Sequence, residues 1–495
     1  MNRDLDLVKN YQKEIALISK ASALLSWDQE VYMPKEGLHS RSEVLSYLSE
    51  KIHNKIISNE LWQAILRLEK NKLNFDDKLM LLKFKKDVIK SRKLPPSLVK
   101  EFSKQSSLAF SKWQEARHKN NYEIFRPYLA KLIDLLKEKA KLIDPKNSVY
   151  NVLLDDFEEG MSVEILRKQF AILKRGLIDL LRKIENSKTY KNHKRFLVKV
   201  NFPKDNQMRL IEDIINRIGL TKDSSRIDFS EHPFTIKISN GDVRFTTALR
   251  ENPIFAFESS IHEAGHALYE SNLPVKHQYD VLGDAPSLGL HESQSRFWEN
   301  MISKNKNFWK FYYSKFNKEL NLKKNLDDWY REINFVYPGL IRVEADEVHY
   351  CLHVILRFEI ELDLFEGKLN TKDLPKVWNL KSKEIFGKEP KNFSEGVLQD
   401  VHWSHGYFCY FPTYAIGSIY AAQLFEAINK KFRNLDGDIA KGDFRKISQW
   451  LKENIHVHGK KMFSDEIIKK ATGRGLDVSI YLNYLNKKYG EIYDF

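Results

Sequence analysis

Two histidines with a glutamate between them form the part of this sequence with the clearest chemistry. Residues 255–270 read FAFESSIHEAGHALYE, which places His262 and His266 four residues apart. On a helix, this spacing projects both imidazoles from one face, where they can bind one metal ion. Glu263 follows His262 directly and can reach a water molecule at the ion's open position. The pattern predicts a metal-binding helix on which Glu263 acts on water.

A catalytic zinc site needs a third protein ligand and keeps one position for water. The next suitable segment is HESQSRFWENMIS, which begins at His291 and has the composition of a second helix. His291 and Glu292 are both possible ligands, but adjacent residues on a helix point about 100° apart. Only one of them can face the ion, and the spacing leaves both open.

The elements that position these residues are predicted to be mainly helices. Apolar residues recur every three or four positions through much of 1–190, as in the stripe from Phe125 to Ile143, and again from 255 to the end. Pro145 ends that stripe, because proline cannot continue a helix. The periodicity therefore predicts a predominantly α-helical protein.

Residues 195–249 differ from the rest of the chain. Three segments there alternate in polarity and are rich in β-branched residues: Phe196–Val200, Thr235–Ile238 and Val243–Thr247. Asn240 and Gly241 separate the last two and favour a tight hairpin, because both residues accept a positive φ. We expect a small β-sheet directly before the metal-binding helix.

The composition fits one large helical unit. The chain has 495 residues, 42% of them hydrophobic, and shows no internal repeat or linker. Two cysteines, Cys351 and Cys409, cannot form a disulfide framework and fit a reducing compartment. The N-terminus lacks the apolar core of a signal peptide, and no apolar run reaches the roughly 18 residues of a membrane span. We predict one cytoplasmic domain, 1–495, with its metal-binding core at about 255–415.

The excess of basic residues allows another interpretation. Lys and Arg number 81 against 67 Asp and Glu, a net charge of +14, and the densest basic stretch is Lys83–Lys93. Such a stretch can bind nucleic acid, but charge runs are usually solvated helix faces. Because no nucleic-acid-binding motif accompanies it, a basic scaffold without catalytic activity is only a remote alternative.

Six short motifs occur in order along the chain. They are HPF at 232–234, DVRFT at 242–246, HEAGH at 262–266, HES at 291–293, IRVEAD at 341–346 and GVLQDVHW at 396–403. In these motifs the sequence resembles the thermostable carboxypeptidase Taq family of metallocarboxypeptidases, and the likeness covers nearly the whole chain. Cys409 departs from it, because the family usually has glycine there.

The resemblance implies a fold, a cofactor and an assembly. It implies an almost entirely helical protein of two lobes around a deep active-site groove, with one divalent ion at the base of the groove. Zinc is the first choice, and cobalt or manganese also suits two imidazoles and a carboxylate. The resemblance further implies a homodimer, and it makes Glu292 of HES the third ligand in place of His291.

With the ion in place, the predicted chemistry is peptide hydrolysis. A divalent ion lowers the pKa of its water from about 15.7 toward 7 and polarises a carbonyl group. Glu263 can take the water proton as general base and deliver it to the leaving amine. We predict a metal-dependent carboxypeptidase that acts on peptides with a free C-terminus. An oligoendopeptidase or dipeptidase with the same metal core is the alternative.

Two further groups of residues complete the predicted site. His402, with Tyr410 or Tyr414 after it, can donate hydrogen bonds to the developing oxyanion, and we prefer Tyr410. A free C-terminal carboxylate needs a cation, for which an arginine fork is suited. Arg342 of IRVEAD is the first candidate and Arg244 of DVRFT the second.

Each arginine has another possible role. Arg342 can pair with Asp346, four residues further along a predicted helix. Arg244 lies on the second hairpin strand, whose edge can pair with an extended substrate backbone. Carboxylates should also orient the histidine ligands, and Asp346, Asp400 and Glu299 are the candidates.

Overall fold

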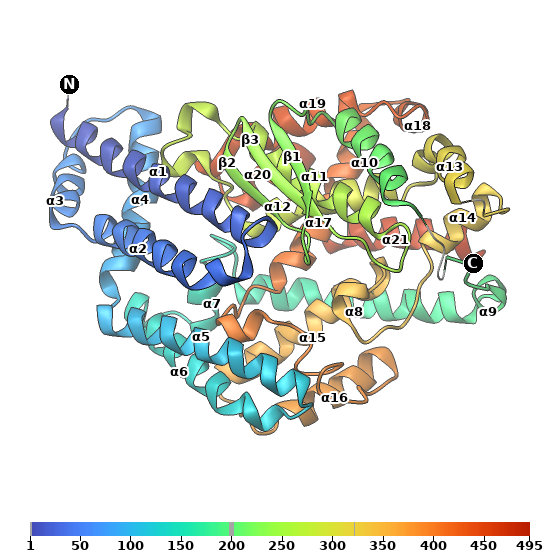
Figure 1. Ribbon diagram of the computed structural model, residues 1–495, viewed down its shortest axis with the longest axis horizontal. Coiled ribbons are helices and arrows are strands. Elements are labelled where there is room, and N and C mark those ends of the chain that lie inside the picture. The colour runs from blue at the N-terminus through green and yellow to red at the C-terminus, as the bar shows by residue number, and fades with distance from the viewer. Residues whose placement is uncertain (1, 198–201, 321) are drawn as a thin grey trace.

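Helices make up most of the structure, a computed structural model that describes residues 2–197, 202–320 and 322–495 (Figure 1). The first half of the chain forms α1 (Arg3–Val31), α2 (Leu38–Ile56), α3 (Asn59–Leu68), α4 (Phe75–Lys93), α5 (Pro96–His118), α6 (Arg126–Ile143), α7 (Val149–Leu154), α8 (Val163–Asn186), α9 (Lys188–Asn192) and α10 (Lys204–Ile218). The second half forms α11 (Phe255–Asn272), α12 (Leu288–Arg296), α13 (Lys306–Leu320), α14 (Leu326–Ile333), α15 (Glu347–Phe365), α16 (Leu374–Phe386), α17 (Pro412–Lys431), α18 (Leu435–Ala440), α19 (Arg445–Asn454), α20 (Ser464–Thr472) and α21 (Val478–Tyr493). The predicted helical class is confirmed.

The helices follow the apolar periodicity of the sequence. The predicted stripe lies on α6, where Leu129, Leu132 and Ala140 are buried, and the helix ends at Ile143 as expected. Side-chain caps mark other helix starts, as where Ser162 accepts a hydrogen bond from the Ile165 amide at the start of α8. Among the helices described, none is both long and apolar enough to cross a membrane.

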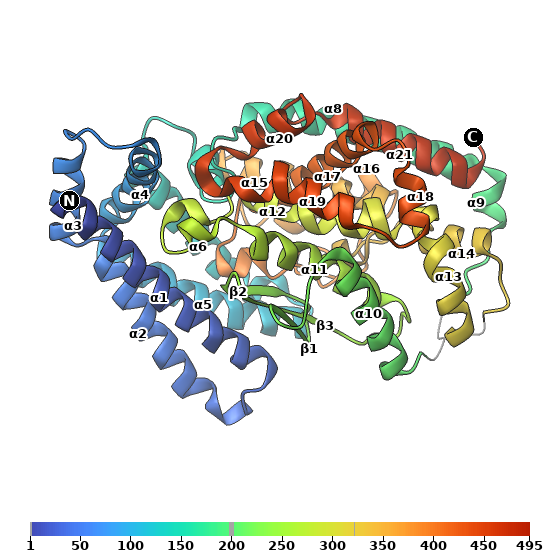
Figure 2. The same ribbon diagram turned by 90° about the horizontal axis from the view of Figure 1, so that it is seen from above.

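Two separate groups of buried apolar side chains form two lobes. The larger group draws on segments from α5 to α21. The smaller group lies mainly on α1, α3 and α4 and consists of Val8, Leu61, Ala64, Ile65, Leu68, Met80, Leu81, Phe84, Val88, Val281 and Leu282. At this end of the molecule, α1 and α2 run side by side as a long hairpin (Figures 1 and 2).

The connection between α11 and α12 is anchored in the smaller lobe. Val281 and Leu282 of this connection are part of the smaller core, and the Val281 amide donates to Gln12 Oε1 at 3.1 Å. Asp76 of α4 pairs with Lys276 of the same connection at 2.9 Å. Because α11 and α12 carry the predicted metal ligands, the smaller lobe helps to fix the segment that joins them.

The small sheet has three strands in the described part of the chain: β1 (Ser225–Phe229), β2 (Thr235–Ser239) and β3 (Asp242–Thr247). The predicted hairpin is confirmed as β2 and β3, which are antiparallel, whereas β1 pairs with β3 in parallel and was not predicted. The strand predicted at Phe196–Val200 is wrong at Phe196 and Leu197, which are not in a strand, and 198–200 lie outside the described residues.

The hairpin turn differs from the expected geometry. Neither Asn240 nor Gly241 has a positive φ. Instead, the side-chain amide nitrogen (Nδ2) of Asn240 donates to the carbonyl oxygen of Leu273 at 2.7 Å, just after the end of α11. The carbonyl groups at a helix end need such donors. Asn240 therefore joins the hairpin to the metal-binding helix.

Two glycines allow α12 to lie close to both of its neighbours. A Cβ atom on Gly265 of α11 would lie 2.6 Å from the carbonyl oxygen of Gln294. A Cβ atom on Gly417 of α17 would lie 2.6 Å from Cγ of Glu292. Any larger residue would push α12 away, so these glycines set the position of Glu292.

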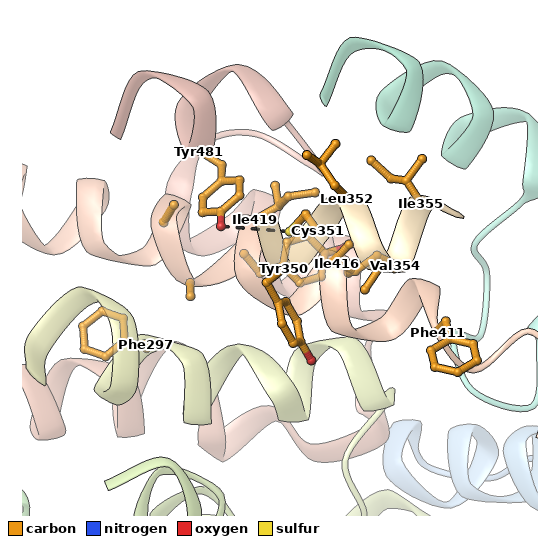
Figure 3. Close-up of a cluster of buried hydrophobic side chains, with 14 of the residues drawn as sticks. Phe297, Tyr350, Cys351, Leu352, Val354, Ile355, Phe411, Ile416, Ile419 and Tyr481 are labelled. Carbon is orange, nitrogen blue, oxygen red and sulfur yellow. Dashed lines mark hydrogen bonds between the residues drawn. The ribbon is translucent and has the colours of Figure 1, made fainter. Parts of the chain in front are cut away.

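The core beside the site is built by α15 and α17. Figure 3 shows Cys351 of α15 within an apolar cluster that includes Ile416 and Ile419 of α17. The Cys351 thiol is free and buried, and it lies 4.0 Å from the Tyr481 hydroxyl. Tyr350 extends from the same turn of α15 with its hydroxyl directed away from this cluster.

An acidic segment pairs with the basic stretch on α4. Lys83 pairs with Glu159, Lys86 with Asp155 and Lys90 with Asp156, at 2.7 to 2.9 Å. These pairs line a cavity of about 380 Å³ between α4, α6 and the segment after α7. The lysines of this stretch thus have partners within the chain.

Candidate functional site

The structure brings His262, His266 and Glu292 together. Both histidines lie one turn apart on α11, and Glu292 lies on α12, which packs against α11. One ligand atom from each residue lies within 4.8 Å of the others. Glu292 Oε2 is 3.7 Å from His262 Nε2 and 3.4 Å from His266 Nε2.

This cluster fits a divalent metal ion. Two ligand atoms bound tetrahedrally at about 2.0–2.1 Å from one ion lie roughly 3.3–3.4 Å apart. The distances from Glu292 Oε2 to the two Nε2 atoms are close to this separation. The donors are two imidazoles and one carboxylate, the set that catalytic zinc sites use.

A carboxylate orients the first histidine. Glu299 Oε2 lies 2.7 Å from Nδ1 of His262, so the imidazole presents Nε2 to the cluster. Glu299 belongs to a π-helical turn, Phe297–Ser303, that continues α12. Such turns are rare and are frequent at functional sites. Of the three candidates for this role, Glu299 alone contacts a histidine of the cluster within the described residues.

His291 lies behind the cluster. Its Nδ1 is 2.6 Å from Nδ1 of His266, and its Nε2 is 2.9 Å from Oε1 of Glu270. His291 and Glu292 point in different directions from α12. Of the two, only Glu292 contributes a ligand atom to the cluster.

Arg296 links the two carboxylates of α12. Its Nε donates to Glu292 Oε1 at 2.8 Å, and its Nη1 donates to Glu299 Oε2 at 3.1 Å. Burial opposes charge on both acids, but the nearby cations outweigh it: the pKa of Glu292 is held well below its usual range, and that of Glu299 falls to about 2. Both carboxylates are therefore ionised at neutral pH.

Glu263 is buried beside the ligands but is not one of them. The Thr235 hydroxyl of β2 donates to Glu263 Oε2 at 2.6 Å. This contact holds Oε2 against the sheet, whereas Oε1 has no hydrogen-bond partner among the described residues. The helix thus presents two imidazoles and one separately held carboxylate.

Arg342 is buried and paired, and its partner is Asp400 and not the alternative Asp346. Its Nε and Nη2 donate to Oδ1 of Asp400 at 3.0 and 2.9 Å. Asp346 instead caps α15 and accepts from His349 Nδ1. The alternative role for Arg342, a pair with Asp346 on one helix, is wrong, because Arg342 lies in a short 3₁₀ turn that ends before α15 begins.

Arg244 lies outside this group. It pairs with Asp242 through Nε and Nη2, both at 2.8 Å, and its guanidinium lies 5.9 Å from the centre of the Trp27 ring. Its strand, β3, is the central strand of the sheet, with β1 on one side and β2 on the other. The predicted free edge on this strand is therefore wrong, and β2 is the edge strand beside Glu263.

His402, Tyr410 and Tyr414 form a group of their own. His402 Nε2 lies 3.2 Å from the Tyr414 hydroxyl, and the ring centres of His402 and Tyr410 are 5.3 Å apart. Burial and the charge of Arg342 lower the pKa of His402 to about 3, so its ring is neutral at physiological pH. Burial raises the pKa of Tyr410 to about 12, so its hydroxyl keeps its proton.

Tyr350 connects the metal-ligand cluster to Arg342. The Arg296 guanidinium lies 3.9 Å from the centre of the Tyr350 ring. The Tyr350 hydroxyl accepts from Arg342 Nη1 at 3.3 Å. Arg342 in turn lies 4.9 Å from the centre of the Tyr414 ring. Side chains from four of the six sequence motifs, HEAGH, HES, IRVEAD and GVLQDVHW, therefore surround one place in the fold, with Tyr350 between them.

Comparisons with known proteins identify the family. The profile of the carboxypeptidase Taq (M32) metallopeptidase family matches residues 7–489. The chain belongs to this family. It is 38% identical to Carboxypeptidase 1 of Bacillus subtilis over 97% of both chains, and 35% identical to Thermostable carboxypeptidase 1 of Thermus thermophilus over 98% of both. The M32 carboxypeptidase of Deinococcus radiodurans R1 superposes with a TM-score of 0.96 at 31% identity, over 99% of this chain and all of that one.

Membership makes the protein a metal-dependent carboxypeptidase, a peptide hydrolase. The departure from the family at Cys409 places a residue other than glycine in a strained backbone conformation. Cys409 has a φ of 64°, in the left-handed region that glycine occupies most readily. Its buried amide donates to Glu361 Oε2 at 3.1 Å, which helps to hold the strained residue in place.

Sequence reasoning missed several residues that surround the candidate metal-ligand cluster. Thr235, Glu270 and Arg296 were not singled out, and His291 was considered only as a ligand. A signal was present in the helical spacing, since Glu270 follows His262 and His266 at the same four-residue interval. Arg296 likewise lies four residues after Glu292 and three before Glu299, which is the spacing of neighbours on a helix face.

Glu158 gives a first testable prediction, about stability and pH. It is buried and accepts a hydrogen bond from the Gly289 amide at the start of α12. Burial raises its pKa from 4.5 to about 8. Between these two values the folded protein keeps a proton that the unfolded chain releases, so this group makes the protein less stable as the pH rises.

We expect Glu158→Gln to remove that contribution, because glutamine accepts the same hydrogen bond without titrating. The stability advantage of the variant should grow with pH between about 5 and 8, by at most about 1.4 kcal/mol per unit, and stay constant above 8. Denaturant unfolding of both proteins at pH 5, 7 and 9 measures the difference. A constant difference at all three values would contradict the prediction.

Proposed function

We propose that this metallocarboxypeptidase uses one zinc ion, held by His262, His266 and Glu292, to release the C-terminal residue of peptides. The observation that supports this most directly is the convergence of the two Nε2 atoms on one oxygen of Glu292. A divalent ion at that place supplies Lewis acidity, which lowers the pKa of water toward 7 and polarises a carbonyl group. Cobalt and manganese also suit these donors.

Glu263 is proposed as the general base and then the general acid. Thr235 occupies its Oε2, so Oε1 is the oxygen that takes the proton from the attacking water. The same oxygen then delivers the proton to the nitrogen of the leaving amino acid. Its position in the sequence, next to His262, keeps the carboxylate near the ligands without making it one of them.

His402 and Tyr410 are proposed to stabilise the developing oxyanion. In the part of the chain that the structure describes, Nδ1 of His402 is buried without a hydrogen-bond partner. Because the ring is neutral and Nε2 faces the Tyr414 hydroxyl, Nδ1 can carry a hydrogen and donate it. Tyr410 keeps its proton and is a second donor.

The terminal carboxylate is proposed to meet the positive charge around Arg342. Arg342 and Arg357 share a single acid, Asp400, so these three buried side chains carry a net charge of +1. Asp400 occupies Nε and Nη2 of Arg342, which leaves Nη1, beside the Tyr350 hydroxyl, as the nitrogen that can turn to a substrate. We further propose that the peptide backbone extends along β2, the edge strand beside Glu263.

Removal of Arg342 gives a second testable prediction. Arg342→Ala leaves a substrate carboxylate without its partner, which costs about 2–5 kcal/mol for a buried charge pair. At 1.4 kcal/mol per factor of ten, kcat/KM on peptides with a free C-terminus should fall roughly 30- to 5,000-fold. Hydrolysis of the matching C-terminal amides, already slow, should hardly change. Arg342→Lys should recover only part of the loss.

The measurement is a pair of rates, for the free acid and the amide, on each variant. Arg244→Ala is the control, because Arg244 pairs with Asp242 away from Tyr350. A parallel loss on both substrates would give Arg342 a structural role through Asp400. Equal wild-type rates on acids and amides would favour an oligoendopeptidase or dipeptidase.

Assembly and location are also proposed. We propose a homodimer, supported by exposed apolar side chains on the α1–α2 hairpin, including Leu17, Tyr32, Leu38 and Tyr47. Two free, buried cysteines support a cytoplasmic location. We propose that both lobes act as one domain, since residues of the smaller lobe hold the connection between α11 and α12. Sedimentation of the purified protein tests the dimer.

A further inference from the structure

His266 is held by a chain of contacts that His262 lacks. Nδ1 of His266 lies 2.6 Å from Nδ1 of His291, and Nε2 of His291 lies 2.9 Å from Oε1 of Glu270. Lys237 of β2 completes the chain, 3.3 Å from Oε2 of Glu270. The contacts connect the edge strand of the sheet, α11 and α12 through a second imidazole.

The hydrogen-bonding capacity of each group in this chain of contacts determines which nitrogen carries each hydrogen. Each oxygen of Glu270 faces a nitrogen that can donate, Nε2 of His291 at 2.9 Å and Nζ of Lys237 at 3.3 Å, so its carboxylate accepts hydrogen bonds from both. Nε2 of His291 then donates to Glu270, and a ring with its hydrogen on Nε2 has a lone pair on Nδ1. That lone pair can accept the Nδ1 hydrogen of His266. Nε2 of His266 then has no hydrogen and faces Glu292.

The two histidines of α11 thus reach the same tautomer by different routes. Glu299 accepts directly from Nδ1 of His262, whereas His266 donates to an imidazole that is itself anchored by a carboxylate. The ring of His291 is also fixed by packing, because the ring of the buried Tyr269 lies 5.3 Å away, centre to centre. Nδ1 of His291 is therefore directed at Nδ1 of His266.

We propose that His291 and Glu270 are positioning residues that fix the tautomer and direction of His266 for metal binding. The inference rests on the proposed metal centre and adds a role for HES: its glutamate is a ligand, and its histidine orients another ligand. Partners of this kind change metal affinity or activity by roughly 10- to 100-fold when they are removed.

Leucine and asparagine at position 291 make a matched pair. The two side chains have nearly the same shape, but only asparagine offers an oxygen that can accept from His266. Affinity for Zn²⁺ and Co²⁺ is measured by competition with a chelator, and the visible spectrum of bound Co²⁺ reports the ligand geometry. The melting temperature of each metal-free protein shows whether packing has changed.

We expect His291→Leu to lower affinity for both metals about 10- to 100-fold and to alter the Co²⁺ spectrum. His291→Asn should stay close to wild type in both, and the two metal-free variants should melt at similar temperatures. Equal losses in both variants would mean that His291 only fills space, and wild-type affinity in both would remove its role. Either result overturns the proposal.

Glu270 provides an independent arm. Glu270→Gln keeps an acceptor for Nε2 of His291, whereas Glu270→Met has a similar length without one. We expect the methionine variant to lose affinity and the glutamine variant to keep most of it. Because the two residues act through one chain, His291→Leu combined with Glu270→Met should cost less than the sum of the single losses. If the loss of metal affinity in the double variant equals the sum of the single losses, His291 and Glu270 do not act through one chain of contacts.

The same experiments separate this inference from the proposed function. Wild-type protein that binds no Zn²⁺ or Co²⁺ would overturn both. Wild-type protein that binds one ion, and loses it in His266→Ala, supports the metal centre on its own. If His291→Leu then binds as tightly as wild type, only the positioning role is wrong.

Discussion

His262→Ala and His266→Ala should each abolish stoichiometric metal binding and peptide hydrolysis together. The proposed site has three protein ligands, and loss of either imidazole leaves two donors for an ion that needs three plus water. The remaining histidine cannot compensate, because Glu299 or His291 already occupies its Nδ1. Metal content after dialysis and the rate on a peptide with a free C-terminus measure the two effects.

His353→Ala is the control for both variants. His353 is more deeply buried than His262 or His266, and its Nε2 lies 3.0 Å from the carbonyl oxygen of Gly339. This variant should keep one metal ion per chain even if it is less stable. Full metal content in both His262→Ala and His266→Ala would disprove the assigned ligands.

Glu263→Gln should separate catalysis from metal binding. Glutamine keeps the volume of the side chain and can still accept from the Thr235 hydroxyl, but its amide takes no proton from water. We expect full metal content and a fall in kcat of roughly 10²- to 10⁴-fold, the range for a general base. Parallel measurements of metal content and of kcat test both parts.

Glu258→Gln is the matched control, since it places the same change on the same helix, one turn before His262. Burial raises the pKa of Glu258, and glutamine keeps the size of its side chain. This variant should keep its activity. Loss of metal in Glu263→Gln, with normal turnover after metal is restored, would make Glu263 a structural residue.

Local spacing was enough to predict the residues proposed for the centre of the site. His262, His266 and Glu263 follow from a short helical pattern, whose consequences are fixed by the geometry of one helix. The choice of Glu292 over His291 came from the family resemblance. The structure adds its physical basis, which is the close approach of α12 to α11 and α17 at two glycines.

The errors lie where partners are distant in sequence. Arg342 pairs with Asp400, 58 residues away, and no local pattern distinguishes that acid from the nearer Asp346. β3 lies in the centre of the sheet because β1 pairs with it in parallel. β1 was not predicted from the sequence, since this segment alternates little in polarity. The turn at Asn240 lacks a positive φ. The side-chain amide of Asn240 instead donates to a carbonyl oxygen at the end of another element, α11. Tertiary contacts override local preference in each case.

The anchoring of Val281 and Leu282 in the smaller lobe has a consequence for synthesis on the ribosome. The helices α1 to α4 are complete at residue 93, yet their core stays open until residue 282 has been made. At 5–20 residues per second, this takes roughly 10 to 40 seconds. During that interval the nascent chain exposes an apolar surface that only its own later segment covers, and this surface is where chaperones would bind.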